Sequence, residues 1–203
     1  TYSSAQTPTL ITLNNNKGQE MVTLLDNKEL KSKTAQLNMP TKEFFSFKTS
    51  EGVELNGWMM KPANFNPSKK YPVIMHQYSG PGSQQVLDKW GIGSFSDGGM
   101  FEAVMCDKGY IMVCVDGRGT GGRGAAFEKC TYLSIGVKEA TDQAEAAKYL
   151  STLPYVDGSR IGIWGWSYGG YNTLMSMSEG SGAFKAGVAI AAPPDWRFYD
   201  SVY

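Results

Sequence analysis

The sequence has little histidine, little cysteine and no excess of either charge. It contains one histidine in 203 residues, and its 19 Lys and Arg residues equal its 19 Asp and Glu residues. A balanced charge creates no net field that would attract nucleic acid or acidic lipid, so the composition argues against both partners. The cysteines, Cys106, Cys114 and Cys130, have neither CxxC nor zinc-knuckle spacing, and an odd number cannot form a closed disulfide set. We interpret them as buried thiols.

Long apolar runs are also missing. No stretch of about eighteen apolar residues is present, so we expect no membrane span in this chain. The first residues, "TYSSAQTPTLITL", lack the basic and apolar parts of a signal peptide, and a start without Met suggests a piece of a longer protein. The length allows a hydrophobic core in one ordinary domain with an appendage.

Residues 1–40 predict a small unit of their own. Alternating runs at Thr9–Leu13 and Gln19–Leu25 flank the polar turn "NNNKG", a pattern typical of a β-hairpin. A polar, briefly helical connector follows and ends at Pro40. We therefore expect a boundary near residue 40, with a second unit over residues 41–203.

From residue 43 the pattern predicts an α/β fold. A strand, turn and second strand open this part, and Tyr71–Gly80 and Gly109–Gly117 are apolar runs of the kind found in strands covered on both faces. The remaining expected elements are a helix within Gly99–Lys108, a helix at Val137–Leu153 that places Val137, Ala140, Ala144 and Ala147 on one face, a strand at Arg160–Trp164, a helix at Tyr168–Ser178 and a strand at Ala186–Ala191. Alternating strands and helices indicate a sheet wound by right-handed crossovers.

One serine stands where a predicted strand becomes a helix. In "GWSYG", Ser167 lies between Gly165 and Gly169, which is the pattern of a nucleophile elbow. Side chains at the two glycine positions would collide with each other and with a neighbouring strand. The start of the helix would offer amide groups to a developing oxyanion. The pattern favours Ser167 as a nucleophile over a chance serine in a glycine-rich turn.

Four motifs together resemble one family. "GWSYGGY" at 165–171, "YSGPGSQ" at 78–84, "DGRGTGGRG" at 116–124 and "WRFYDSVY" at 196–203 are similar to the prolyl oligopeptidase family of serine peptidases, most closely to its dipeptidyl peptidase IV branch. The resemblance implies an α/β-hydrolase fold for residues 41–203, truncated after the strand that follows the nucleophile helix. It also implies that residues 1–40 are the last blade of a β-propeller and its linker.

The resemblance also predicts which catalytic groups the chain lacks. The family carries its triad in the order Ser, Asp, His, so the acid and the base are expected beyond Tyr203. Asp195 and Asp200 precede the strands that should hold the triad acid, and we assign neither. His76 lies upstream of Ser167, which is the wrong order for this fold, so we interpret it as a structural histidine.

Other site residues follow from the same resemblance. Tyr78 would donate its hydroxyl to the oxyanion together with the backbone amide of Tyr168. Trp196, Tyr199 and Tyr203 would line a pocket for proline, whose compact apolar ring suits flat aromatic walls. From the residues alone, aromatic side chains at this spacing fit a core equally well.

Two further patterns invite a cofactor or a metal. The motif GxGxxG is present at Gly117, Gly119 and Gly122. A dinucleotide-binding site requires a helix directly after these glycines, and we expect no helix before Ser134. We interpret the loop as tight backbone packing beside the active site. Asp142 and Glu145 are expected on an exposed helical stretch as surface or structural acids, because no His or Cys adjoins them. We therefore predict no cofactor and no metal.

The leading hypothesis is a serine exopeptidase that releases N-terminal Xaa-Pro or Xaa-Ala dipeptides through an acyl-enzyme on Ser167. A tripeptidyl or acylaminoacyl peptidase of the same family is the nearer alternative, and a non-catalytic fragment is the alternative from another class. The expected partners are peptides with proline in second position and a second copy in a homodimer. We expect a periplasmic, secreted or cell-surface location, and an inactive isolated chain.

Overall fold

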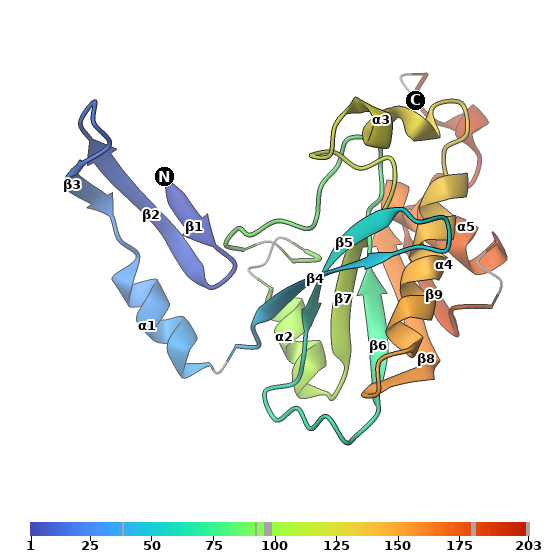
Figure 1. The fold of residues 1–203 in the computed structure, drawn as a ribbon, viewed down its shortest axis with the longest axis horizontal. Coiled ribbons are helices and arrows are strands. Elements are labelled where there is room, and N and C mark those ends of the chain that lie inside the picture. The colour runs from blue at the N-terminus through green and yellow to red at the C-terminus, as the bar shows by residue number, and fades with distance from the viewer. Residues whose placement is uncertain (38, 92, 96–98, 180–181, 202–203) are drawn as a thin grey trace.

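The chain forms two sheets joined by a helix, as Figure 1 shows. The computed structural model describes residues 1–37, 39–91, 93–95, 99–179 and 182–201. The smaller sheet has the antiparallel order β1-β2-β3, with β1 (Tyr2–Ser4), β2 (Thr7–Asn14) and β3 (Glu20–Leu25). β2 and β3 confirm the predicted hairpin, whereas β1 is too short to show an alternating pattern. The connector contains α1 (Lys28–Gln36), the brief helix expected there.

The larger sheet has six strands in the order β4-β5-β7-β6-β8-β9. Its strands are β4 (Lys42–Lys48), β5 (Glu54–Met60), β6 (Tyr71–His76), β7 (Ile111–Asp116), β8 (Val156–Trp166) and β9 (Ala186–Ile190). β4 pairs antiparallel with β5, and β5 pairs antiparallel with β7, which confirms the predicted antiparallel opening. The other pairs are parallel. The structure thus confirms the α/β class.

Helices lie on both faces of this sheet. They are α2 (Met100–Asp107), α3 (Ala125–Glu128), α4 (Val137–Ser151) and α5 (Tyr168–Glu179), with short 3₁₀ turns η1 (Lys129–Thr131) and η2 (Trp196–Phe198). α4 packs against α5 and β8, and α2 packs against β5 and β7. Within the described residues, none of the helices has the length and apolarity needed to cross a bilayer.

The alternating side chains of β7 build two separate core clusters. Val113 and Val115 pack with Leu150 of α4, whereas Met112 and Cys114 lie in the cluster that includes Cys106 of α2. Every residue of β7 is buried, as expected of a strand covered on both faces. The buried strand β7 therefore supports its neighbour β6 and, through β6, the strand β8. β6 and β8 are the strands that lead to the candidate site.

Three details differ from the sequence predictions. Val137 is 55% exposed, whereas Ala140, Ala144 and Ala147 of the same predicted face are buried, because Val137 is the first residue of α4. β8 begins at Val156, ahead of the predicted Arg160. Cys106 and Cys114 are buried thiols as predicted, but Cys130 is half-buried, and its Sγ lies 3.1 Å from the Phe127 carbonyl oxygen.

Candidate functional site

The predicted elbow is a tight turn between β8 and α5. Ser167 is half-buried and adopts a left-handed backbone conformation with φ of 57°. Its amide donates to the Ile190 carbonyl oxygen at 2.9 Å, and its carbonyl oxygen accepts from the Tyr171 amide at 3.0 Å. A residue other than glycine in this conformation costs on the order of 1 kcal/mol or more, so the surroundings must hold the turn in place.

The glycines on either side of Ser167 allow a close approach of backbone. A Cβ on Gly165 would lie 2.5 Å from the Gln77 carbonyl oxygen and 2.5 Å from backbone atoms of Gly169. A Cβ on Gly169 would lie 2.5 Å from the same Gln77 oxygen. The structure therefore shows the collisions expected from the sequence at both glycine positions. A larger residue at either position would displace the turn from the end of β6.

Tyr78 lies beside this turn. It follows β6, and the Gln77 amide just before it donates to the Trp164 carbonyl oxygen at 3.1 Å. The rings of Tyr78 and Tyr168 are 6.1 Å apart between centroids. The structure thus brings Tyr78 to the elbow, where the sequence predicts it to act.

The predicted pocket aromatics gather at the start of α5. The Trp196 ring lies 5.7 Å from the Tyr168 ring and 4.9 Å from the Tyr171 ring, between centroids. Tyr199 contacts Trp196 at 5.4 Å and is 40% exposed. Tyr203 lies outside the described residues. Two of the three predicted pocket residues therefore form one aromatic cluster with the elbow.

His76 is a core side chain of the sheet. It is 5% exposed, and its ring lies 4.9 Å from the Trp164 ring between centroids. Burial, with a smaller contribution from the positive charge of Lys42, lowers the pKa of His76 to about 4. The imidazole is therefore neutral near pH 7, and its placement agrees with the structural interpretation.

The glycine-rich loop packs on the segment after Tyr78. The Gly82 amide donates to the Gly119 carbonyl oxygen at 2.9 Å, and the Gly121 amide donates to the Ser83 carbonyl oxygen at 2.8 Å. This contact supports the interpretation as backbone packing. The expectation that no helix begins before Ser134 was wrong, because α3 and η1 precede it. α3 is a single turn, however, and does not have the aligned amides of a longer helix.

Asp116 fastens the same segment from the end of β7. Its carboxylate accepts hydrogen bonds from the Gln85 amide at 2.9 Å and the Val86 amide at 2.7 Å. Burial raises the pKa of Asp116 to about 6, and the two amide hydrogen bonds oppose that rise. The side chain thus serves as an acceptor for backbone groups.

Asp142 is fully buried, so the expectation of an exposed acid was wrong. The guanidinium of Arg118 donates to both of its oxygens, with Nη2 2.7 Å from Oδ1, and the Arg118 amide donates to Oδ2 at 2.7 Å. This pairing raises the pKa of Arg118. Glu145 accepts from the Ser50 amide at 2.7 Å, which makes it a structural acid as well. Across the described part of the chain, no group of three or more His, Cys, Asp or Glu side chains could hold a metal ion.

The sequence does not predict the buried polar side chains behind the elbow. Gln77 donates from Nε2 to the Gly169 carbonyl oxygen at 2.6 Å and to Thr173 Oγ1 at 3.0 Å, and Asn172 donates to Gln77 Oε1 at 3.0 Å. Glu139 accepts from the Tyr168 hydroxyl at 2.8 Å. One sequence signal points to this network: Gln77 directly precedes Tyr78 at the end of an apolar run. A buried side-chain amide there would cost free energy unless it had hydrogen-bond partners.

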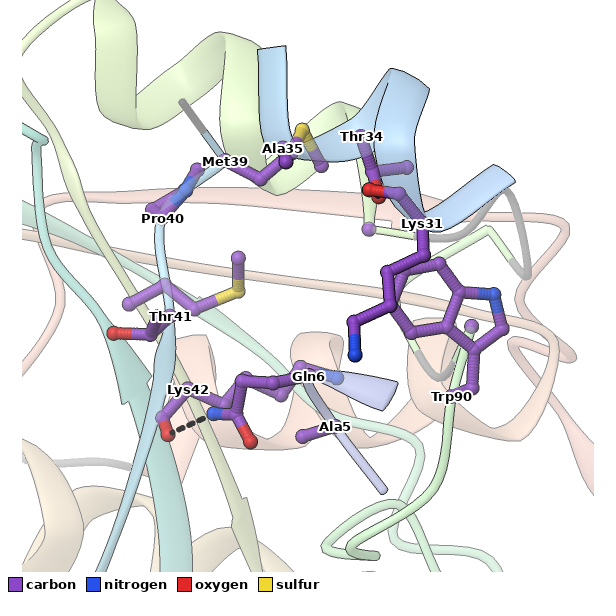
Figure 2. A pocket seen from close by; sticks show the side chains of 13 residues that line it. Ala5, Gln6, Lys31, Thr34, Ala35, Met39, Pro40, Thr41, Lys42 and Trp90 are labelled. Carbon is purple, nitrogen blue, oxygen red and sulfur yellow. Dashed lines mark hydrogen bonds between the residues drawn. The ribbon is translucent and has the colours of Figure 1, made fainter. Parts of the chain in front are cut away.

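A cavity of about 320 Å³ lies away from the elbow. It is lined by α1, by residues 39–41 of the connector and by β4 and β5 of the larger sheet. Figure 2 shows Lys31 and Trp90 on one side of it and Met39 and Pro40 on the other. Gln6 lies at its lower edge in this view and donates from Nε2 to the Lys42 carbonyl oxygen at 3.2 Å. The cavity shares no lining residue with the elbow cluster, so it is not the candidate catalytic site.

Comparisons with known proteins agree with these observations. The model of the prolyl oligopeptidase family matches residues 99–203. A probable dipeptidyl-aminopeptidase B of Metarhizium robertsii is 41% identical over 182 residues, which are 89% of this chain and 19% of that protein. A probable dipeptidyl peptidase 4 of Aspergillus flavus is 36% identical over 203 residues, all of this chain and 26% of that protein.

A solved structure shares the whole fold. The crystal structure of Porphyromonas gingivalis dipeptidyl peptidase 4 matches with a TM-score of 0.93 and 53% identity, over 100% of this chain and 28% of that one. The likeness confirms the α/β-hydrolase fold expected from the motifs. The chain spans only about a fifth to somewhat over a quarter of the length of these relatives.

Proposed function

The chain belongs to the prolyl oligopeptidase family, and from this membership we propose that the protein carrying it is a serine peptidase that removes dipeptides from peptide N-termini. The observation that carries the proposal is the elbow: Ser167 in a left-handed turn between a strand and a helix, with Tyr78 and an aromatic cluster beside it. The names of the relatives above support the dipeptidyl class.

The proposed chemistry is acyl transfer. Ser167 Oγ attacks the carbonyl carbon of the scissile peptide bond and passes its proton to a general base. The oxyanion that forms accepts hydrogen bonds from the Tyr78 hydroxyl and the Tyr168 amide, near the start of α5. The carbon–nitrogen bond then breaks, the amine leaves with a proton from the base, and water hydrolyses the acyl-enzyme.

We propose that the general base is a histidine outside these 203 residues. His76 is the one histidine in the chain, and it is buried against Trp164 with a pKa of about 4. A neutral imidazole packed inside the sheet is poorly placed to take a proton from Ser167. The isolated chain should therefore be inactive, because an alcohol without its base is a weak nucleophile.

The aromatic cluster supports a substrate with proline in second position. Trp196 and Tyr199 offer apolar faces beside the elbow, and Tyr199 is exposed enough to contact a bound ring. We include Tyr203 in this pocket on the resemblance of its motif. Alanine would fit the same space with less apolar contact. A homodimer and a periplasmic, secreted or cell-surface location stay predictions from the resemblance.

The test uses the complete protein that carries this sequence. It should cleave a chromogenic Gly-Pro substrate faster than a matched tripeptidyl or acylaminoacyl substrate, and a fluorophosphonate probe should label Ser167. Ser167→Ala should abolish both. Ser178→Ala, a serine on the same helix whose hydroxyl bonds to the Leu174 carbonyl, is the matched control and should change neither. Full activity in Ser167→Ala would overturn the proposal, and faster tripeptide release would overturn the dipeptidyl assignment.

A further inference from the structure

The buried carboxylate of Glu139 connects the first turn of α4 to the elbow. Glu139 has no exposed surface, and Tyr168 is 2% exposed. Glu139 Oε1 accepts from the Tyr168 hydroxyl at 2.8 Å, and Oε2 accepts from the Gly136 amide at 3.0 Å. Each oxygen therefore has its own partner, and the two partners come from different elements.

The helix that carries Glu139 is fixed to the sheet. Asp142, one turn further along α4, pairs with Arg118 just after β7. Gln143 donates from Nε2 to the Val115 carbonyl oxygen at 2.9 Å, also at the end of β7. The carboxylate of Glu139 is thus held at a defined place, in the first helical turn, where the helix dipole favours a negative charge.

The elbow needs an anchor of this kind. Ser167 has a φ of 57°, a conformation that persists only when its surroundings determine it. Gln77 holds the Gly169 carbonyl from the side of β6. Tyr168 lies between Ser167 and Gly169 in the sequence. Its hydroxyl is held from the side of α4, so its ring fixes the position of its own backbone.

We propose that Glu139 is a positioning residue, which accepts the hydrogen bond of the Tyr168 hydroxyl and thereby keeps the Tyr168 amide aimed at the oxyanion. This inference rests on the proposed function, because it assigns a purpose to the amide only if Ser167 is acylated. Glu139 touches no reacting atom, and it acts through Tyr168.

A purely structural role makes a different prediction. If Glu139 only caps α4 through Gly136, the Tyr168 hydroxyl is dispensable for turnover. Tyr168→Phe removes that hydroxyl and leaves the contact between Glu139 and Gly136 intact, so it separates the two roles. Glu139→Gln leaves one oxygen to serve two donors and should weaken the same link. Glu145→Gln changes a half-buried carboxylate on the same helix, whose partner is the Ser50 amide and not the elbow, and is the matched control.

The experiment measures kcat and KM for a Gly-Pro substrate in the complete protein, with kcat expressed per active site titrated by a fluorophosphonate. Tyr168→Phe should lower kcat roughly tenfold and change KM less than about twofold, because a displaced donor weakens oxyanion binding and leaves substrate binding intact. Glu139→Gln should act similarly. The double variant should be no worse than the stronger single one, since both break one link.

Three outcomes would overturn the role of Glu139. They are an unchanged kcat in Tyr168→Phe, additive losses in the double variant, and a loss in Glu145→Gln equal to that in Glu139→Gln. Ser167→Ala, measured alongside, separates this failure from that of the proposed function: an active Ser167→Ala overturns both, whereas an inactive one leaves the proposed function standing. If Glu139→Gln does not fold, the kcat of Tyr168→Phe decides alone.

Discussion

The imidazole of His76 lies against the indole of Trp164, with ring centroids 4.9 Å apart in the interior of the larger sheet. The two residues are paired in register on the parallel strands β6 and β8. Both are nearly buried, at 5% and 6% exposed. This contact buries the one histidine of the sequence in the core, which agrees with the proposal that another group serves as the base for Ser167.

The burial of His76 predicts a loss of stability in acid. Its pKa is about 4 in the folded chain and about 6.5 when unfolded, so the unfolded state binds the proton first. The contribution of His76 to stability is therefore complete above pH 6.5, and about 3 kcal/mol of it is lost as the pH drops to about 4. His76→Gln lacks this titration. Denaturant unfolding at pH 7.5 and pH 4.5 should show the smaller acid loss in the variant, and parallel losses would show that His76 titrates normally in the fold.

The elbow could be predicted because its cause is local. Gly165 and Gly169 stand in the pattern that the turn requires, and strand-like and helix-like runs flank them. The burial of Asp142 could not be predicted, because its partner Arg118 lies 24 residues away and only the fold brings them together. The same holds for Glu139, whose hydrogen bond to Tyr168 spans 29 residues. Sequence patterns locate turns and faces, but the partner of a buried charge depends on tertiary contacts.

Tyr78→Phe tests the oxyanion role of the Tyr78 hydroxyl. The variant keeps the ring and its contact with Tyr168, and deletes only the donor. In the complete protein, kcat for a Gly-Pro substrate should fall by roughly a hundredfold or more with little change in KM, since the oxyanion exists only after attack. Steady-state kinetics provide the measurement. A raised KM with normal kcat would instead assign Tyr78 to substrate positioning.

Tyr199→Ala tests the aromatic wall. Removing the ring takes away an apolar surface beside Trp196 that we expect the substrate proline to contact. The value of kcat/KM for Gly-Pro substrates should fall about tenfold or more, and more than for Gly-Ala substrates, which have less apolar surface to lose. Phe198→Ala is the control, because that ring is 84% exposed. Equal losses in both variants would remove Tyr199 from the pocket.

Asp116 predicts a pH effect opposite in sign to that of His76. Its pKa is raised from 3.8 to about 6 in the fold, chiefly by burial, so the unfolded state loses its proton first. The folded state is then favoured at low pH, and stability decreases by about 3 kcal/mol as the pH rises from about 4 to about 6. This window overlaps that of His76, so the two effects offset each other in the unmodified chain.

Asp116→Asn should therefore separate them. The amide oxygen of asparagine can still accept from the Val86 and Gln85 amides, so the segment after Tyr78 keeps its anchor, while the cost of ionising a buried carboxyl disappears. The free energy of unfolding of the variant, minus that of the unmodified chain, should be about 3 kcal/mol larger at pH 7.5 than at pH 4. Denaturant unfolding at both pH values measures this. A stability difference that stays the same at both would mean that Asp116 ionises in the fold as easily as in the unfolded chain, and that its hydrogen bonds fully offset its burial.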